Sequence, residues 1–241
     1  MGYSTVKWAP WAALAVFWFA TAAPAAEEAE GLGGEAELGM VTTSGNTNTR
    51  SVNAKAKLHY LSGPWRHEGR LEGLRTSDGD TVTAERYLAS GKSDYRYTPT
   101  DYVFATVRYE DDRFSGYDYQ MSETVGYGHR LVNRDSVTLD LEIGAGGRHS
   151  RETGGRARDE GIVRGAARLG WDVSATARFS EELLVESGES NTYTESVAAL
   201  RVKINSRFAM KLSLTVKHNS EVPAGVEHTD SMSAVTLVYD F

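Results

Sequence analysis

The sequence predicts an all-β protein, a single up-and-down antiparallel β-barrel of about twelve strands that crosses the outer membrane of a Gram-negative bacterium. Three observations predict it: a secretory leader, short segments that alternate apolar and polar residues, and an aromatic residue at the carboxy-terminus. The predicted domains are a cleavable signal peptide at residues 1–25, a short linker at 26–33 and the barrel at 34–241.

The amino-terminal segment has the layout of a leader for export through the inner membrane. Lys7 precedes an apolar run at residues 8–20, and a small-residue stretch containing Ala23-Pro24-Ala25 follows. The run is shorter than the roughly 20 residues that a membrane-spanning helix needs. We therefore expect a cleaved signal peptide rather than a membrane anchor.

Alternating segments fill the chain from about Gly34 onward. The clearest lies at residues 208–217, where Phe208, Met210, Leu212 and Leu214 share one face and polar residues share the other. Similar segments are centred near residues 38, 55, 70, 91, 106, 125, 141, 167, 181, 199, 212 and 235. An even count of strands is what a bacterial single-chain barrel requires.

The predicted connections alternate in length. Tight turns are expected at residues 62–64, 98–101, 132–135, 174–176 and 205–207, and longer polar loops at 76–83, 111–118, 149–160, 187–193 and 219–228. The first connection, which contains Gly45 and Asn46, is expected to be a short hairpin instead. Short periplasmic turns and longer outer loops are typical of outer-membrane barrels.

Aromatic side chains predict two girdles at the edges of the bilayer. Those expected near the short turns are Tyr60, Trp65, Tyr97, Tyr102, Trp171, Phe179 and Phe208. Those expected near the long loops are Tyr87, Tyr109, Phe114, Tyr117 and Tyr193.

The last strand carries a predicted assembly signal, the outward stripe formed by Val235, Leu237, Tyr239 and the terminal Phe241. Such an ending predicts recognition by the barrel-assembly machinery and by periplasmic chaperones. The other expected partners are outer-membrane lipid and lipopolysaccharide. The sequence does not predict the oligomeric state.

The inward face of the strands is predicted to be strongly ionic. The expected lumen-lining charged residues are Lys55, Lys57, Arg66, Glu68, Arg70, Glu72, Arg86, Lys92, Asp94, Arg96, Arg108, Glu110, Asp140, Glu142, Arg164, Arg168, Glu182, Glu186, Arg201, Lys203, Lys211 and Lys217. Two interpretations stay open. The charges could neutralise one another in a plugged interior, or they could form a selectivity lining whose basic excess leans weakly toward anions.

Composition excludes several other functions. The chain has no cysteine, which excludes disulfides and thiolate chemistry. Its formal net charge is −7 and it has no basic block, so nucleic acid is not an expected partner. No cofactor is expected.

Catalytic and metal-binding interpretations are weaker. His218 and Ser220 lie two positions apart and could share a strand face, and His149-Ser150 is a second histidine–serine pair. A serine beside histidine or asparagine at the start of a loop is more often a turn residue. The acidic residues Asp78, Asp80, Asp111, Asp112, Asp159 and Glu160 could hold calcium, but we interpret them as solvated loop acids. We therefore expect no enzyme activity, no catalytic residue and no metal site, and an outer-membrane hydrolase is the least favoured function.

Several motifs also carry a family resemblance. Residues 34–48, the run Tyr109-Glu110-Asp111-Asp112-Arg113-Phe114-Ser115, the triplet Gly126-Tyr127-Gly128 and the ending Tyr239-Asp240-Phe241 resemble a family of uncharacterised salt-induced outer membrane proteins. The resemblance implies a signal-bearing outer-membrane barrel of unknown activity that is linked to salt or osmotic stress. It provides no catalytic or binding residues.

The sequence thus predicts a narrow pore for small polar or charged solutes, associated with salt or osmotic stress. The alternative is a non-conducting structural or surface-interaction barrel whose lumen is closed by its own salt bridges.

Overall fold

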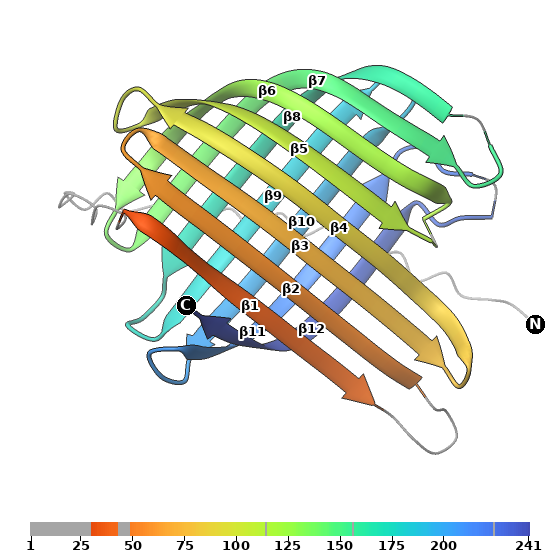
Figure 1. Cartoon of the computed structure of the whole chain (residues 1–241), viewed down its shortest axis with the longest axis horizontal. Helices are drawn as coiled ribbons and strands as arrows, with labels where there is room; N and C mark the ends of the chain where they lie inside the picture. Colours follow the sequence, from red (N-terminus) through yellow and green to blue (C-terminus); the bar gives the residue numbers. More distant parts are fainter. Residues whose placement is uncertain (1–29, 43–48, 114, 156, 224) are drawn as a thin grey trace, which may run out of the picture.

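The computed structural model describes residues 30–42, 49–113, 115–155, 157–223 and 225–241. These residues form a closed barrel of twelve antiparallel strands, each paired with its neighbours in sequence and the last paired with the first (Figure 1). The predicted fold class is confirmed. The predicted signal peptide lies outside the described residues, and among those that are described no helix is long and apolar enough to cross a membrane.

Each predicted segment centre lies inside a strand. The strands are β1 Gly31–Thr42, β2 Thr49–Ser62, β3 Trp65–Asp78, β4 Thr81–Arg96, β5 Asp101–Asp112, β6 Tyr117–Arg134, β7 Val137–Glu152, β8 Ala157–Asp172, β9 Ala177–Gly188, β10 Thr192–Lys203, β11 Phe208–Asn219 and β12 Thr229–Asp240. β1 begins inside the predicted linker, because Gly31 already pairs with Leu61 of β2.

The predicted long loops are mostly wrong, because the strands continue through them. Residues 76–83 form the ends of β3 and β4 joined at Gly79 and Asp80, and Gly79 adopts the positive φ of 58° that a tight turn requires. Backbone N–H and C=O groups form the same hydrogen bonds between strands whatever the side chains are. Polar residues can therefore extend the strands beyond the apolar band. Only the connection at 220–228 is long among the predicted loops, and the predicted hairpin at 43–46 lies outside the described residues.

The barrel carries its apolar side chains outside and its charged side chains inside, the reverse of a soluble protein. Buried positions alternate with exposed ones along each strand, and the exposed positions carry large apolar side chains such as Leu38, Ile143, Leu212 and Val235. The buried positions carry charges such as Glu142. An apolar outer band around a polar interior is the pattern of a barrel surrounded by lipid.

The aromatic residues separate into two groups that the girdle prediction did not distinguish. The outward group includes Tyr60, Trp65, Tyr97, Trp171, Phe208, Tyr87 and Tyr109, each more than a third exposed. Tyr102, Tyr117 and Tyr193 instead point inward and are buried, so they were wrongly assigned to the girdles. Strand position decides this, because all three fall on the inward register of β5, β6 and β10. Phe114 lies outside the described residues.

The seam between β1 and β12 closes the barrel over a short distance. Among the described residues, their pairing runs only from Glu35–Asp240 to Leu38–Leu237, and Gly34 exchanges backbone hydrogen bonds with Phe241. β1 pairs with β2 along its whole length. In Figure 1 the two strands meet beside the C-terminus and run apart from there.

Candidate functional site

The interior ionic network is the candidate functional site. Strand alternation directs every second side chain inward, and the structure places all the predicted lumen-lining residues on the inward register of their strands. Lys203 lies at the C-terminal end of β10 and is exposed. Glu186 is buried and accepts a hydrogen bond from Ser122 (3.1 Å).

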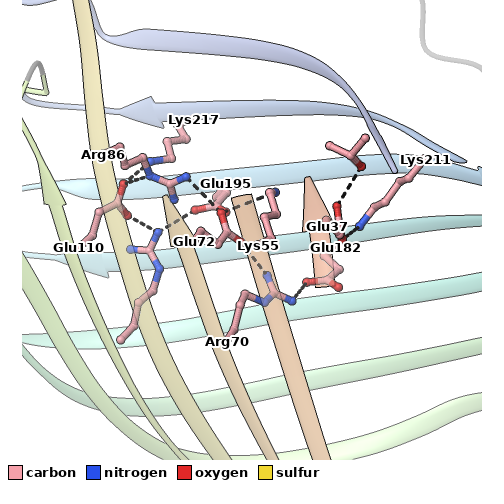
Figure 2. A network of polar contacts seen from close by, with 12 residues as sticks. Glu37, Lys55, Arg70, Glu72, Arg86, Glu110, Glu182, Glu195, Lys211 and Lys217 are labelled. Carbon is pink, nitrogen blue, oxygen red and sulfur yellow. Dashed lines mark hydrogen bonds and ion pairs between the residues drawn. The ribbon is translucent and has the colours of Figure 1, made fainter. Parts of the chain in front are cut away.

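Glu110 of β5 is the centre of the first cluster. Its carboxylate accepts a hydrogen bond from Arg86 Nε at 2.7 Å and also pairs with Arg108 and Lys217. Because Lys217 belongs to β11, this contact crosses the barrel. Figure 2 shows Arg86 and Lys217 converging on the Glu110 carboxylate.

Two further pairs connect opposite walls at a similar depth. Arg70 of β3 donates to Glu182 of β9 at 2.9 Å, and Arg108 of β5 donates to Glu195 of β10 at 2.8 Å. Arg70 also lies 3.8 Å from Glu72, which joins this pair to the first cluster (Figure 2). Together these contacts form an ionic layer across the bore.

A second cluster surrounds Glu142 of β7, whose side chain is 1% exposed. Lys92 and Arg164 each lie 2.8 Å from its carboxylate, and Arg168 lies 3.6 Å away. The Tyr102 hydroxyl donates a further hydrogen bond of 2.9 Å. Three cations and a hydroxyl surround one buried carboxylate, so these contacts hold the inward side chains of this wall in place.

Glycines make room for that cluster. A Cβ on Gly126 would lie 2.7 Å from the Phe104 ring, and one on Gly128 would lie 2.2 Å from the Tyr102 ring. The two aromatic rings therefore lie directly against the backbone of β6. Lys92 sits 5.2 Å from the centre of the Phe104 ring and 5.1 Å from that of Tyr102, within the range of cation–π attraction.

The ionic layer divides the interior into two larger cavities. One cavity, of about 510 Å³, lies at the end of the barrel that carries the C-terminus and is lined by residues such as His59, Arg130 and Arg201. The other, of about 470 Å³, lies at the opposite end near Asn53. Between them, spaces of about 50 and 100 Å³ are lined by the charged side chains of the layer. A space of roughly 10–15 Å³ can hold a water molecule, so the constriction is narrow but large enough for water.

Sequence reasoning missed several interior residues. Glu37 pairs with Lys211 at 2.7 Å, and Glu195 pairs with Arg108, as described above. The period-two alternation of β1 and β10 could have identified both. These added carboxylates reduce the basic excess on which the weak anion preference was based.

Two other missed residues were harder to find. Arg130 forms a bidentate hydrogen bond with Asp140 (2.7 and 3.1 Å). It was missed because a register shift between Arg130 and Val132 breaks the alternation of inward and outward side chains. Arg148 pairs with Glu160 at 2.7 Å, and Glu160 had been assigned to a loop.

The histidine–serine pairs do not form catalytic arrangements. His218 Nδ1 is bonded to the Thr229 hydroxyl at 2.9 Å, whereas the Ser220 hydroxyl contacts Asn191 Oδ1 at 3.2 Å. His149 contacts Asp159 and Glu123 on the outer face, and its neighbour Ser150 is buried on the inner register. A nucleophile and base need hydrogen-bond reach of each other, which neither pair has. In the part of the chain that the structure describes, no group of three or more potential ligands could hold a metal ion.

The predicted assembly signal lies on the outward face of β12. Val235, Leu237 and Phe241 are each about half exposed, and Tyr239 is close to Phe208 (5.2 Å between ring centres). Phe241 follows the strand and lies against Gly34, where a Cβ would come within 2.8 Å of the phenyl ring.

Comparison with known sequences gives a family and a relative. A family model described as "Protein of unknown function, DUF481" matches residues 36–241. The uncharacterized protein YdiY of Escherichia coli strain K12 is 29% identical over 209 residues, which cover 86% of this chain and 82% of that protein.

Comparison with solved structures supports the fold. An outer-membrane channel from Pseudomonas putida F1 is similar with a TM-score of 0.54 at 13% identity, covering 90% of this chain and 97% of that one. The NanC porin is similar with a TM-score of 0.50 at 9% identity, covering 87% and 97%. The translocator domain of the autotransporter NalP from Neisseria meningitidis has a TM-score of 0.50 at 11% identity, covering 89% and 90%. At these identities the likeness shows the outer-membrane barrel fold alone.

Proposed function

This chain belongs to the DUF481 family of proteins of unknown function, and we propose that it forms a narrow outer-membrane pore for small polar or charged solutes. A signal peptide directs its export, and the barrel-assembly machinery and chaperones insert it among lipid and lipopolysaccharide. The end of the barrel at which the C-terminus and the predicted short turns lie faces the periplasm.

The observation that carries the proposal is the series of polar cavities along the interior. Cavities of about 510 and 470 Å³ lie at the two ends. Smaller spaces lined by ion pairs lie between them and share Lys57 and Glu182 with the first cavity and Thr215 with the second. Rings of charged side chains are what selective pores use to choose solutes. The similar fold of the NanC porin and of the outer-membrane channel from Pseudomonas putida F1 supports this proposal.

The mixed charge of the lining limits its selectivity. Lys211 is balanced by Glu37, and Arg108 by Glu110 and Glu195. We therefore expect low conductance with weak preference between anions and cations.

Recording from purified protein in a planar lipid bilayer tests the proposal. Discrete current steps that increase with salt concentration are the expected result. Arg70→Ala removes the bridge to Glu182 and should raise the conductance severalfold. Arg75→Ala is the matched control, because Arg75 is 60% exposed and faces outward, so its conductance should equal that of the wild type.

A non-conducting barrel is the second candidate, and the contacts between opposite walls favour it. Lys217 reaches Glu110 and Arg70 reaches Glu182 across the bore, so the interior ion pairs could serve only to hold the barrel closed. Folded protein that remains electrically silent, including the Arg70→Ala variant, would support this candidate and reject the pore.

Two further parts of the proposal have direct tests. Membrane fractionation should place the mature protein, without its leader, in the outer membrane. The link to salt or osmotic stress predicts that protein abundance rises when salt is added to the growing cells, and constant abundance would remove it.

A further inference from the structure

The seam between β1 and β12 contains a second candidate site, separate from the proposed pore. The pairing of the two strands ends at Leu38–Leu237, yet β12 continues back to Thr229 and β1 continues to Thr42. The cavity of about 470 Å³ opens here and touches side chains of both faces of the wall. From outside it is lined by Met40, Leu212 and Val235, which are 53–65% exposed on the apolar surface.

The polar side of the cavity contains two hydrogen-bond donors without acceptors. Asn53 Nδ2 and Arg86 Nη2 are buried, and neither has a hydrogen-bond partner among the described residues. Both residues are 7% exposed and line the cavity. A buried donor without an acceptor is destabilising, because it has lost its hydrogen bonds to water, so an acceptor brought by a ligand would stabilise this site.

The strand register brings these donors to one level of the barrel. Gly39 is paired with Asn53, Asn53 with Leu74, and Leu74 with Arg86. Adjacent strands lie roughly 4.8 Å apart, so about 10 Å separates the backbones of the two donor residues. Gly39 lines the cavity beside Asn53, and its lack of a Cβ lets β12 approach closely, because a Cβ there would lie 2.9 Å from Thr236 Cγ2. The cavity extends from this close contact along the unpaired parts of β1 and β12.

The charges around the cavity select the kind of acceptor. Arg86 and Lys217 are the basic lining residues, and Glu85, Asp112 and Asp230 are the acidic ones. Arg86 and Lys217 already pair with Glu110. The site thus has no positive excess to attract a carboxylate or phosphate, and a neutral acceptor fits better.

We propose that the seam binds a single-chain amphiphile with an uncharged, hydrogen-bond-accepting head group. The head group accepts hydrogen bonds from Asn53 and Arg86 inside the barrel, and the alkyl chain passes between β1 and β12 along Met40, Leu212 and Val235. With the C-terminal end in the periplasm, the chain enters the outer half of the membrane. The seam thereby connects the interior to the bilayer.

Photocrosslinking of the folded full-length mature protein in lipid vesicles tests this assignment. The probe is a monoacylglycerol with a diazirine on its acyl chain, and mass spectrometry locates the label. We expect labelling of Met40, Leu212 and Val235 several times stronger than that of Leu183, an exposed leucine on β9. Equal labelling of Leu183 and the seam residues would show general contact with lipid and would overturn the proposal.

Asn53→Leu removes one donor and keeps the size of the side chain. It should reduce seam labelling about tenfold, which corresponds to the loss of one hydrogen bond near 1.4 kcal/mol. Asn133→Leu on β6 is the matched control, and heat-modifiable gel migration verifies that both variants fold. Unchanged seam labelling in folded Asn53→Leu would contradict the proposed role of the amide.

A second probe and a closed seam complete the test. A fatty acid with the same diazirine chain should label the seam less than the monoacylglycerol, and stronger labelling would reject the neutral head group. The chain has no native cysteine, so Met40→Cys with Val235→Cys can be joined by a short thiol cross-linker. Joining them should abolish Leu212 labelling, whereas persistent labelling would show that the seam is not the route. Ion conductance is not a readout here, so failure of this site leaves the pore proposal to its own test.

Discussion

The wall formed by β6, β7 and β8 and the seam between β1 and β12 close the same barrel in different ways. β6 and β7 pair from Tyr117–Glu152 to Arg134–Val137, and charged and aromatic side chains fill the space beneath them. The seam pairs over a few residues and has a cavity beneath it. The difference teaches that inward side-chain size, as well as strand pairing, determines where a barrel wall is complete.

Removing the charge at the centre of the complete wall should have the largest effect. Glu142→Gln leaves Lys92, Arg164 and Arg168 without their shared carboxylate. Leaving buried charges unpaired costs about 3–5 kcal/mol, so we expect a loss of that size in urea unfolding measured in lipid vesicles. A loss below about 1 kcal/mol would mean that water already solvates the cluster.

A methyl group inside the same wall should have the next largest effect. On Gly126 a Cβ would lie 2.2 Å from the Ile143 carbonyl oxygen and 2.6 Å from Gly144 Cα, both backbone atoms that cannot move aside. Gly126→Ala should therefore cost about 3 kcal/mol, at the upper end of the usual overpacking range. The control is Gly165→Ala on β8, where a Cβ meets nothing within 4 Å and stability should not fall.

The corresponding change at the seam should cost less. A Cβ on Gly39 would lie 2.9 Å from the Thr236 Cγ2 atom and from the Val235 carbonyl oxygen. Beyond this point β1 and β12 are no longer paired with each other, so they can separate slightly, and we expect a loss of about 1 kcal/mol. If urea unfolding gives equal losses for Gly39→Ala and Gly126→Ala, the seam is as rigid as the opposite wall.

The smallest effect is expected at an exposed ion pair beside the seam cavity. Arg113 is 67% exposed and pairs with Glu85 at 3.2 Å. Exposed ion pairs contribute about 0–1 kcal/mol, so Arg113→Ala should change the free energy of unfolding by less than that and leave gel migration unchanged. A larger loss would show that the surface at this end supports the barrel.

Local alternation was sufficient to predict the strand number, and it is also the basis on which the charged residues were assigned to the interior. Side chains on a strand alternate whatever their partners are, so Glu110 and Arg70 could be assigned to the interior from their neighbours alone. Tyr102 was misplaced because its proximity to a turn was given more weight than its register. The loops were overestimated because polar residues such as Thr76 pair into the ladder as readily as apolar ones.

Other features depend on distances across the barrel. The Arg70–Glu182 contact joins residues far apart in the sequence, and no local pattern indicates which strands face each other across the bore. The same is true of the seam. How far β1 and β12 remain paired depends on the stagger of all twelve strands, which also places Asn53 beside a gap.

The short pairing of β1 with β12 also has a consequence for the order of folding. Its residues, such as Gly34 and Phe241, are the most distant in the chain, whereas every other strand pair is joined by a local hairpin. Contacts of long sequence separation form late, because closing a long loop costs more entropy. The final step of assembly would then be the pairing of β1 with β12, in which the Phe241 ring packs against Gly34 and the open sheet closes into a barrel.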